Sequence, residues 1–210
     1  MKNKLIIFGI RSTAIELAEV VKEYYNSKFS DIVLLFVDKE RKDKGNKLHI
    51  PEIDIHLSNN KCNYIISFAD IMLRVEVEKI MKKKGINPVN IIHPKSIISK
   101  TSKMGYGNYV AANVVISSNA IINNHNIINY NATIGHDVVM EDHIIVNPSA
   151  CISGNVYIGS RVLVGANSFV FQGKKIGNDT LIDAMTYIDR DIDCNMICSS
   201  KQLKTYKRVK

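Results

Sequence analysis

The sequence predicts two parts of different fold class, an α/β N-terminal domain with a small parallel sheet and then a parallel β-helix of hexapeptide repeats. Residues up to about 95 alternate short apolar runs with segments of helical periodicity. From residue 98, an aliphatic residue or Met recurs at every sixth position. We therefore expect a Rossmann-like domain over residues 1–95, a β-helix domain over 96–193 and a C-terminal tail over 194–210.

The N-terminal half reads as strands that alternate with helices. "KLIIFGI" and "DIVLLFVD" are short runs rich in β-branched residues, which favours strands. Between them, "STAIELAEVVKEYY" has helical spacing, and Ser12 or Thr13 is placed to cap its start. "KCNYIISFA" predicts a strand, "IMLRVEVEKIMKKKG" a helix closed by Gly85, and "VNIIHP" a further strand. This order predicts a small parallel sheet, as in nucleotide-binding folds.

The sixfold series dominates the second half and never changes phase. Its sixteen members are Ile98, Met104, Val110, Ile116, Ile122, Ile128, Ile134, Met140, Val146, Ile152, Ile158, Val164, Val170, Ile176, Ile182 and Ile188. A period of six is typical of hexapeptide β-helices, in which each hexad supplies one short strand and one turn. Three hexads complete a coil, and successive coils stack at roughly 4.8 Å. The sixth-position side chains are expected to fill the interior.

Composition indicates an ordinary soluble globular protein. The 210 residues are 46% hydrophobic and 23% charged. No apolar run reaches the roughly 20 residues that span a bilayer, and "MKNKLIIFGI" lacks the cleavage site of a signal peptide. The four cysteines, Cys62, Cys151, Cys194 and Cys198, have neither metal-ligand spacing nor a dense disulfide framework. A reduced, cytoplasmic protein is expected.

The formal net charge of +8 suits a polyanionic partner. Nucleic acid, coenzyme A and a nucleotide-sugar all qualify, and a solvated lysine-rich surface is the alternative. Apart from the tail "KTYKRVK", the basic residues are scattered, and no stretch interleaves Arg with aromatic residues. We therefore expect no nucleic-acid partner.

A coil of 18 residues lets the sequence predict which side chains are vertical neighbours. His125 and His143 differ by 18 and are expected to stack on one turn, as a polar ladder or a metal site. No third ligand follows at a convincing spacing, so the ladder is favoured and no metal is expected.

His136, in "NATIGHDVVMED", is the most informative polar residue of the repeats. It is the third residue of its hexad, on a turn, with Ser118 one coil before and Gly154 one coil after. A glycine there leaves space beside the imidazole, and Asp137 is placed to orient the ring and to stabilise its protonated form. A neutral histidine can accept a proton during acyl transfer. The alternative is a polar residue that only solvates a surface turn.

The segment "INYNATIGHDVVMEDHIIVNPSACISGNVYIGSRVLVGANSFV" resembles the catalytic region of bacterial hexapeptide-repeat sugar acyltransferases with an N-terminal nucleotide-sugar-binding domain. That family includes UDP-bacillosamine and GDP-perosamine N-acetyltransferases and sialic acid O-acetyltransferases. The resemblance spans essentially the whole chain, and its most specific motif is the His–Asp or His–Glu pair after "xIG". It implies a left-handed β-helix, a homotrimer with acetyl-CoA in the groove between two subunits, and His136 as general base supported by Asp137.

The resemblance also implies binding residues. The nucleotide-sugar is expected at Gly9, Arg11, Ser12, Thr13, Asp38, Lys39, Asp70, Arg74 and Asn129. The coenzyme is expected at Ile145, Gly154, Ala166 and Ala184. For several of these a plainer reading stays open, namely a helix cap at "RST", a solvated loop at "DKE", and a ladder of Asn129 with Asn147.

The chain departs from the family pattern in several places, including Ala184, where the family usually has Gly, and "FADIMLR", which replaces a Gly-Asp-Asn stretch. Ile145 stands where related enzymes have a second histidine that contacts the coenzyme. "NMICSSKQ" replaces the usual C-terminal Gly-x-Pro-Ala, and the N-terminal loop "GIRSTA" keeps only Gly9 of the family's glycines. The resemblance is weakest for two sets of contacts, those of the C-terminal segment with the coenzyme and those of the N-terminal loop with the nucleotide-sugar.

The leading hypothesis is an acetyl-CoA-dependent acetyltransferase that acts on a nucleotide-linked amino sugar, a 4-amino sugar above all, for bacterial surface glycan synthesis. One alternative is O-acetylation of a sugar, sialic acid included. Another is a β-helix protein that binds ligands without catalysis. An oxidoreductase is disfavoured because the N-terminal half lacks G-x-G-x-x-G.

Overall fold

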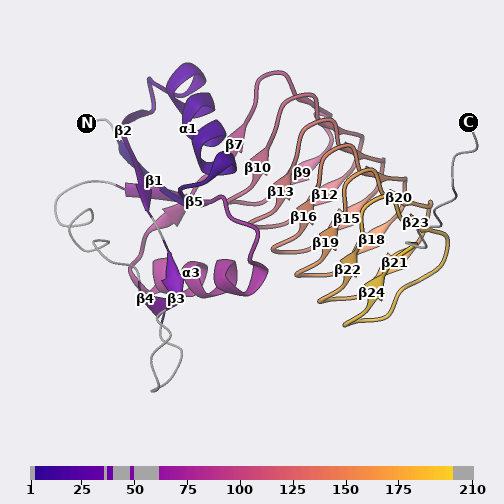
Figure 1. The fold of residues 1–210 in the computed structure, drawn as a ribbon. Helices are drawn as coiled ribbons and strands as arrows, with labels where there is room; N and C mark the ends of the chain where they lie inside the picture. Colours follow the sequence, from indigo (N-terminus) through magenta and orange to yellow (C-terminus); the bar gives the residue numbers. More distant parts are fainter. Residues whose placement is uncertain (1–2, 36, 40–47, 50–61, 201–210) are drawn as a thin grey trace, which may run out of the picture.

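A computed structural model describes residues 3–35, 37–39, 48–49 and 62–200. A small α/β unit sits at one end of a long parallel solenoid, whose coils continue to the other end of the molecule (Figure 1). Along the described ranges, no helix is both long and apolar enough to cross a membrane.

The N-terminal unit contains the predicted parallel sheet, with strand order β2-β1-β5-β6. Its strands are β1 (Asn3–Phe8), β2 (Phe29–Leu35), β5 (Cys62–Ile66) and β6 (Asn87–Pro88), and a short antiparallel pair is formed by β3 (Asp38–Lys39) and β4 (Leu48–His49). The central strand β1 has its last four residues, LIIF, fully buried, because a strand covered on both faces is apolar along its whole length.

Two helices, α1 (Ser12–Tyr24) and α3 (Ile71–Lys83), confirm the predicted helical segments. The predicted cap of the first helix is wrong, because the chain turns into α1 at Arg11, which makes no side-chain cap hydrogen bond and leaves Ser12 and Thr13 inside the first turn. The cap of α3 is Asp70, whose Oδ1 accepts the Leu73 amide at 2.9 Å.

The solenoid is built of two-residue parallel strands in three sheets, which we call the first, second and third faces. The first face holds β7 (Ile91–Ile92), β10 (Tyr109–Val110), β13 (Ile127–Ile128), β16 (Ile145–Val146), β19 (Leu163–Val164), β22 (Leu181–Ile182) and β24 (Ile197–Cys198). The second holds β8 (Ile97–Ile98), β11 (Val115–Ile116), β14 (Thr133–Ile134), β17 (Cys151–Ile152), β20 (Phe169–Val170) and β23 (Tyr187–Ile188). The third holds β9 (Lys103–Met104), β12 (Ile121–Ile122), β15 (Val139–Met140), β18 (Tyr157–Ile158) and β21 (Lys175–Ile176).

The coils extend beyond the sixfold series at both ends. The strand predicted in "VNIIHP" does not join the N-terminal sheet, because Ile91–Ile92 pairs with Tyr109–Val110 as the first strand of the first face. At the other end, Ile197–Cys198 pairs with Leu181–Ile182, inside the segment expected to be tail. Both two-residue strands belong to the solenoid because their backbone hydrogen-bond partners lie in the neighbouring coil.

The sixfold residues fill the solenoid interior as predicted. From Val110 to Ile188, each one is at most 4% exposed, and only Ile98 and Met104 in the first coil are partly exposed. The turns between faces hold residues at positive φ, such as Asn113, Asn119 and Asn131. Asn and Asp tolerate this left-handed conformation better than other non-glycine residues, which explains their frequency at the corners.

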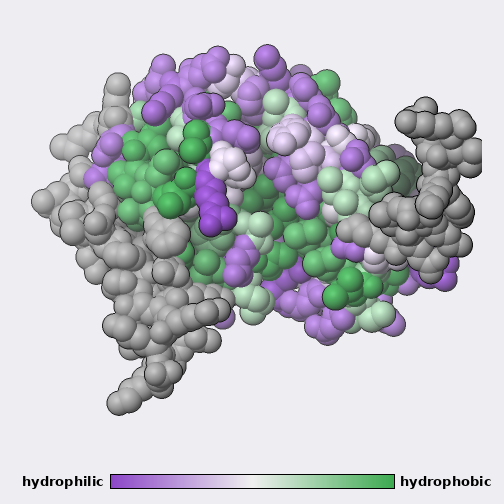
Figure 2. Space-filling view, viewed as in Figure 1, coloured by the Kyte–Doolittle hydropathy of each residue, from purple (hydrophilic) through white to green (hydrophobic). Residues whose placement is uncertain are grey.

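The N-terminal unit covers the near part of the first face. Outward side chains there, such as Tyr109, Ile127 and Ile145, are only 3% exposed and join the apolar cluster that contains α1 residues. Farther along the same face, Leu181 is 37% and Ile197 is 74% exposed, and Figure 2 shows hydrophobic residues at the surface around β22 and β24. The N-terminal unit and the first face therefore share one boundary, where a cavity opens.

Candidate functional site

A cavity of about 550 Å³ lies between the N-terminal unit and the first face of the solenoid. The loop after β1 and the loop after β5 form one wall, and solenoid residues form the other. Both loops follow the carboxyl ends of adjacent parallel strands, which is where ligands bind in open α/β sheets. The sequence-predicted residues that line it are Gly9, Arg11, Ser12, Thr13, Asp70, Asn129 and Ile145.

The loop after β1 approaches the neighbouring loop closely at Gly9. Its φ is +136°, and a Cβ atom there would lie 2.3 Å from Ser67 Oγ, so a larger residue would be both strained and crowded. Ser67 donates from Oγ to the Phe8 carbonyl at 2.9 Å, which joins the two loops. Ser67 also lines the cavity and was not predicted, since only its place after a strand marks it.

The predicted solenoid residues of the cavity are the part-buried Asn129 and the buried Ile145. Asn129 donates from Nδ2 to Asn147 Oδ1 at 3.4 Å, so the predicted ladder forms, and both side chains line the cavity. Ile145 lies beside them and is 3% exposed. The 18-residue spacing pointed to Asn147 as a ladder partner but not as a lining residue.

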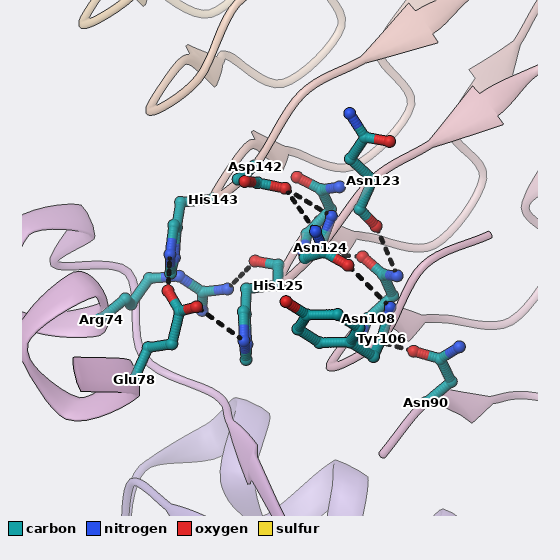
Figure 3. Close-up of polar contacts among 11 residues, drawn as sticks. Arg74, Glu78, Asn90, Tyr106, Asn108, Asn123, Asn124, His125, Asp142 and His143 are labelled. Carbon is teal, nitrogen blue, oxygen red and sulfur yellow. Dashed lines mark hydrogen bonds and ion pairs between the residues drawn. The ribbon is translucent and has the colours of Figure 1, made fainter. Parts of the chain in front are cut away.

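Arg74 lies behind the cavity wall and is not one of its lining residues. It is fully buried, and its guanidinium donates to the Ile66 and Phe68 carbonyls, both at 3.1 Å, and to the His125 carbonyl (Figure 3). Burial lowers the pKa of Arg74 to about 9. Its geometry holds the loop after β5 against the solenoid. Asp38 and Lys39 form β3, and their side chains lie outside the described part of the structure.

The predicted stack of His125 and His143 is confirmed, with ring centroids 5.1 Å apart and an angle of 8° between the rings. The stack is buried under α3 and does not form an exposed ladder. Glu78 of α3 reaches both rings, with Oε2 at 2.6 Å from His143 Nε2 and Oε1 at 3.6 Å from His125 Nε2 (Figure 3). Over the described residues, no group of three His, Cys, Asp or Glu side chains is placed to hold a metal ion.

His136 occupies the corner between the second and third faces. Its Nδ1 lies 2.8 Å from Asp137 Oδ2, and the two side chains are 49% and 46% exposed. Hydrogen bonds from His136 and Asn119 lower the pKa of Asp137, so its carboxylate is charged near neutral pH and can only accept. Nδ1 of a neutral ring must therefore carry the proton, which leaves the Nε2 lone pair available as a base.

Gly154 is placed against this base as the coil spacing predicted. A Cβ atom at position 154 would lie 2.4 Å from His136 Nε2 and 2.6 Å from Cε1, so the imidazole occupies the space that the glycine leaves. Gly135 is required too, because a Cβ there would lie 2.6 Å from the Gly154 amide nitrogen. Gly135 and Asn119 were not predicted, although the 18-residue step from Asp137 leads directly to Asn119.

The predicted residues therefore fall into two separate groups. The cavity group lies over the first face, whereas His136, Asp137 and Gly154 lie at the opposite corner of the coil. The half-buried Ala166 and Ala184 follow β19 and β22, at the corner between the first and second faces. Within one chain the structure does not bring the cavity and the candidate base together.

No family model matches the sequence, and no curated protein sequence matches it. Solved structures match over nearly the whole chain. PerB from Caulobacter crescentus, solved with CoA and GDP-perosamine, is 23% identical, with 93% of each chain covered and a TM-score of 0.81. Solved structures of the perosamine N-acetyltransferase also include variants in which one histidine is replaced by asparagine or alanine.

Two further structures show the same likeness. The acetyltransferase domain of PglB from Neisseria gonorrhoeae FA1090, solved with acetyl coenzyme A, is 21% identical, covers 94% of this chain and 96% of its own, and has a TM-score of 0.79. WeeI from Acinetobacter baumannii AYE is 16% identical, with 93% and 96% covered and a TM-score of 0.81. The chain thus shares the whole two-part fold of these structures, the N-terminal unit as well as the solenoid.

Proposed function

We propose that this protein is an acetyl-CoA-dependent acetyltransferase that acylates the amino group of a nucleotide-linked amino sugar, with a 4-amino sugar favoured, in bacterial surface polysaccharide synthesis. The observation that carries the proposal is the geometry at His136, a half-exposed imidazole with Nδ1 held by Asp137 and Nε2 facing a glycine. The whole-chain likeness to structures named as a perosamine N-acetyltransferase and as the acetyltransferase domain of PglB supports it.

In the proposed reaction, His136 accepts a proton from the sugar amine through Nε2. The amine nitrogen forms a bond to the thioester carbonyl carbon, and the carbon–sulfur bond then breaks. The leaving sulfur takes the proton back from Nε2 of the imidazolium, which gives the thiol and the amide and restores the neutral base. Asp137 keeps the proton on Nδ1 and stabilises the imidazolium that forms. The catalytic residues in this proposal are His136 and Asp137.

The cavity suits the nucleotide part of the substrate. The N-terminus of α1 opens into it, and helix N-termini bind phosphate through free amide groups and the helix dipole. Arg11 adds a cation at the same point. The proposed nucleotide-sugar residues are Gly9, Arg11, Ser12, Thr13, Asp38, Lys39, Asp70 and Asn129, with Arg74 supporting the wall.

For the coenzyme we propose Gly154, Ala166, Ala184 and Ile145. Gly154 packs directly against the His136 ring, so a thioester held beside it would lie close to the base, and the two half-buried alanines leave room on the surface. Gly154 lies at one corner, the two alanines lie at another, and Ile145 lies on the first face. One coenzyme molecule therefore contacts them all only if two subunits contribute. We therefore propose a homotrimer of left-handed solenoids in the cytoplasm. Each chain has a Rossmann-like N-terminal domain and a catalytic β-helix domain, and the β-helix takes in Ile91–Ile92 and Ile197–Cys198 beyond its expected bounds of 96–193.

The proposal is tested by incubating the protein with acetyl-CoA and UDP-, dTDP- or GDP-linked 4-amino sugars. Mass spectrometry should show one added acetyl group on one of these sugars. The His136→Ala variant should lose roughly 100-fold or more of the rate, since a positioned general base contributes about 10²–10⁴-fold. Acetylation of a hydroxyl sugar but of no amino sugar would instead assign an O-acetyltransferase.

The result that rejects the function is the absence of acetylated product from every sugar, with folded protein verified by circular dichroism. Full activity in the His136→Ala variant would leave an acetyltransferase but remove the proposed base.

A further inference from the structure

A column of polar side chains runs along the corner between the second and third faces and ends at the candidate base. Thr101, Asn119 and Asp137 occupy equivalent positions in three successive coils, 18 residues apart. Thr101 Oγ1 accepts a hydrogen bond from the backbone N–H of Asn119 at 3.0 Å. The side chain of Asn119 donates in turn from Nδ2 to Asp137 Oδ1 at 3.1 Å. Each residue therefore fixes the next one along the column.

The two oxygens of Asp137 have different partners. Oδ2 lies 2.8 Å from His136 Nδ1, whereas Oδ1 accepts from Asn119. The terminal torsion of an aspartate has only broad preferences, so a single hydrogen bond would leave a half-exposed carboxylate free to rotate. A second donor on the other oxygen defines its plane and hence the direction in which it meets the imidazole.

We propose that Asn119 is a positioning residue for the candidate base, and that it acts by holding the Asp137 carboxylate in the orientation that keeps the His136 proton on Nδ1. The inference rests on the proposed function for its catalytic consequence. The orientation of the His136–Asp137 pair can be measured without any substrate.

The repeat itself supplies a matched control. Asn113 has φ +60° and donates from Nδ2 to Asn131 Oδ1 at 3.2 Å, so it repeats the conformation and the contact of Asn119, whose φ is +58°. The Asn113 contact joins two amides, whereas the Asn119 contact reaches a carboxylate paired with a histidine. Glycine is the replacement of choice at both positions, because it removes the side chain and accepts positive φ without strain.

The test compares wild-type protein with the Asn119→Gly and Asn113→Gly variants by NMR, with no substrate present. In Asn119→Gly the pKa of Asp137 should rise, because the charged carboxylate loses one of its two hydrogen bonds, and a smaller share of neutral His136 should carry its proton on Nδ1. In Asn113→Gly both quantities should equal the wild-type values. Asn119→Asp keeps the backbone preference but faces one carboxylate with another, so it should raise the pKa of Asp137 further.

Acetyl transfer gives the catalytic readout. Asn119→Gly should lower kcat roughly tenfold, a part of the 10²–10⁴-fold supplied by a positioned base, with little change in KM. Unchanged Asp137 titration and His136 tautomer in Asn119→Gly would overturn the proposal, and so would a kcat equal to that of Asn113→Gly. If the spectra shift in Asn119→Gly but the wild-type protein acetylates none of the sugars, the positioning role is supported and the proposed function is rejected.

Discussion

At Gly154 the solenoid backbone packs directly against the candidate base. An added Cβ would overlap three atoms of the imidazole, at 2.4 Å from Nε2, 2.6 Å from Cε1 and 2.8 Å from Cδ2. Because His136 is half exposed, its ring can swing toward solvent at a small cost in stability. The fold would survive that movement, but the base would lose its position.

We expect Gly154→Ala to lower the acetyl-transfer rate roughly 100-fold, since a displacement of about 1 Å in a reacting group can cost that much. The midpoint of thermal unfolding should change little, because the three atoms nearest the added Cβ all belong to a movable side chain. Steady-state rates and a thermal melt of the same preparation measure the two effects.

The double variant His136→Ala/Gly154→Ala is the control for this prediction. With the imidazole removed, the added methyl group has nothing to displace, so the double variant should be no slower than His136→Ala alone. A further loss of rate in the double variant would mean that Gly154 serves the reaction through a contact other than the one with His136.

Helix α3 joins the N-terminal unit to the solenoid because side chains one helical turn apart reach residues one coil apart. Arg74 and Glu78 are one helical turn apart, and the residues they reach, His125 and His143, are one coil apart (Figure 3). Burial lowers the pKa of His125 to about 4, and the hydrogen bond with His143 lowers the pKa of Glu78. The folded protein therefore holds His125 neutral and Glu78 charged in a buried boundary.

Acid should weaken this boundary. In the unfolded chain His125 takes up a proton near pH 6.5, whereas in the folded protein it does so only near pH 4, so stability falls as the pH drops from about 6.5 to about 4. The contribution of Glu78 to stability is also lost as the pH falls, because its carboxylate becomes protonated. We expect a loss on the order of 2–3 kcal/mol from His125, measured by denaturant unfolding at pH 7 and pH 4.5.

His125→Asn isolates that contribution. Asn accepts the positive φ of +56° at this position and does not titrate in the range. The variant should be less stable at pH 7, but its stability should fall less with acid than that of the wild type. An equal fall in both proteins would assign the acid sensitivity to other groups.

The elements show which parts of the fold a sequence can reveal. The helices and the sixfold strands were predicted because their signals lie within a few residues, in apolar spacing and in the closing Gly85, which has φ +69°. The assignment of Ile91–Ile92 failed because a two-residue strand belongs to whichever sheet offers it a partner, here one coil away. The coil step placed Gly154 against His136 within the repeats, but it could not reveal Glu78, since nothing in the solenoid spacing shows what α3 brings to it.

At the scale of the whole molecule, the cavity and the candidate base lie on opposite sides of the solenoid. The cavity covers the first face near β13 and β16, whereas His136 follows β14 of the second face and precedes β15 of the third. A substrate held in the cavity therefore meets the base of another subunit in the proposed trimer. Light scattering should give three times the chain mass, and a monomer would remove the shared site.

Mixed trimers provide the decisive measurement of that arrangement. A His136→Ala chain keeps its cavity but lacks the base, and a Gly9→Ala chain keeps the base but has its cavity loop crowded by Ser67. Each variant alone should be nearly inactive. In a cyclic trimer assembled from equal amounts of both, about a quarter of the shared sites combine an intact cavity with an intact base, so co-expression should restore roughly that share of the wild-type rate. Trimers of both chains that stay inactive would place cavity and base in the same subunit, and would require the N-terminal unit to move around the solenoid during catalysis.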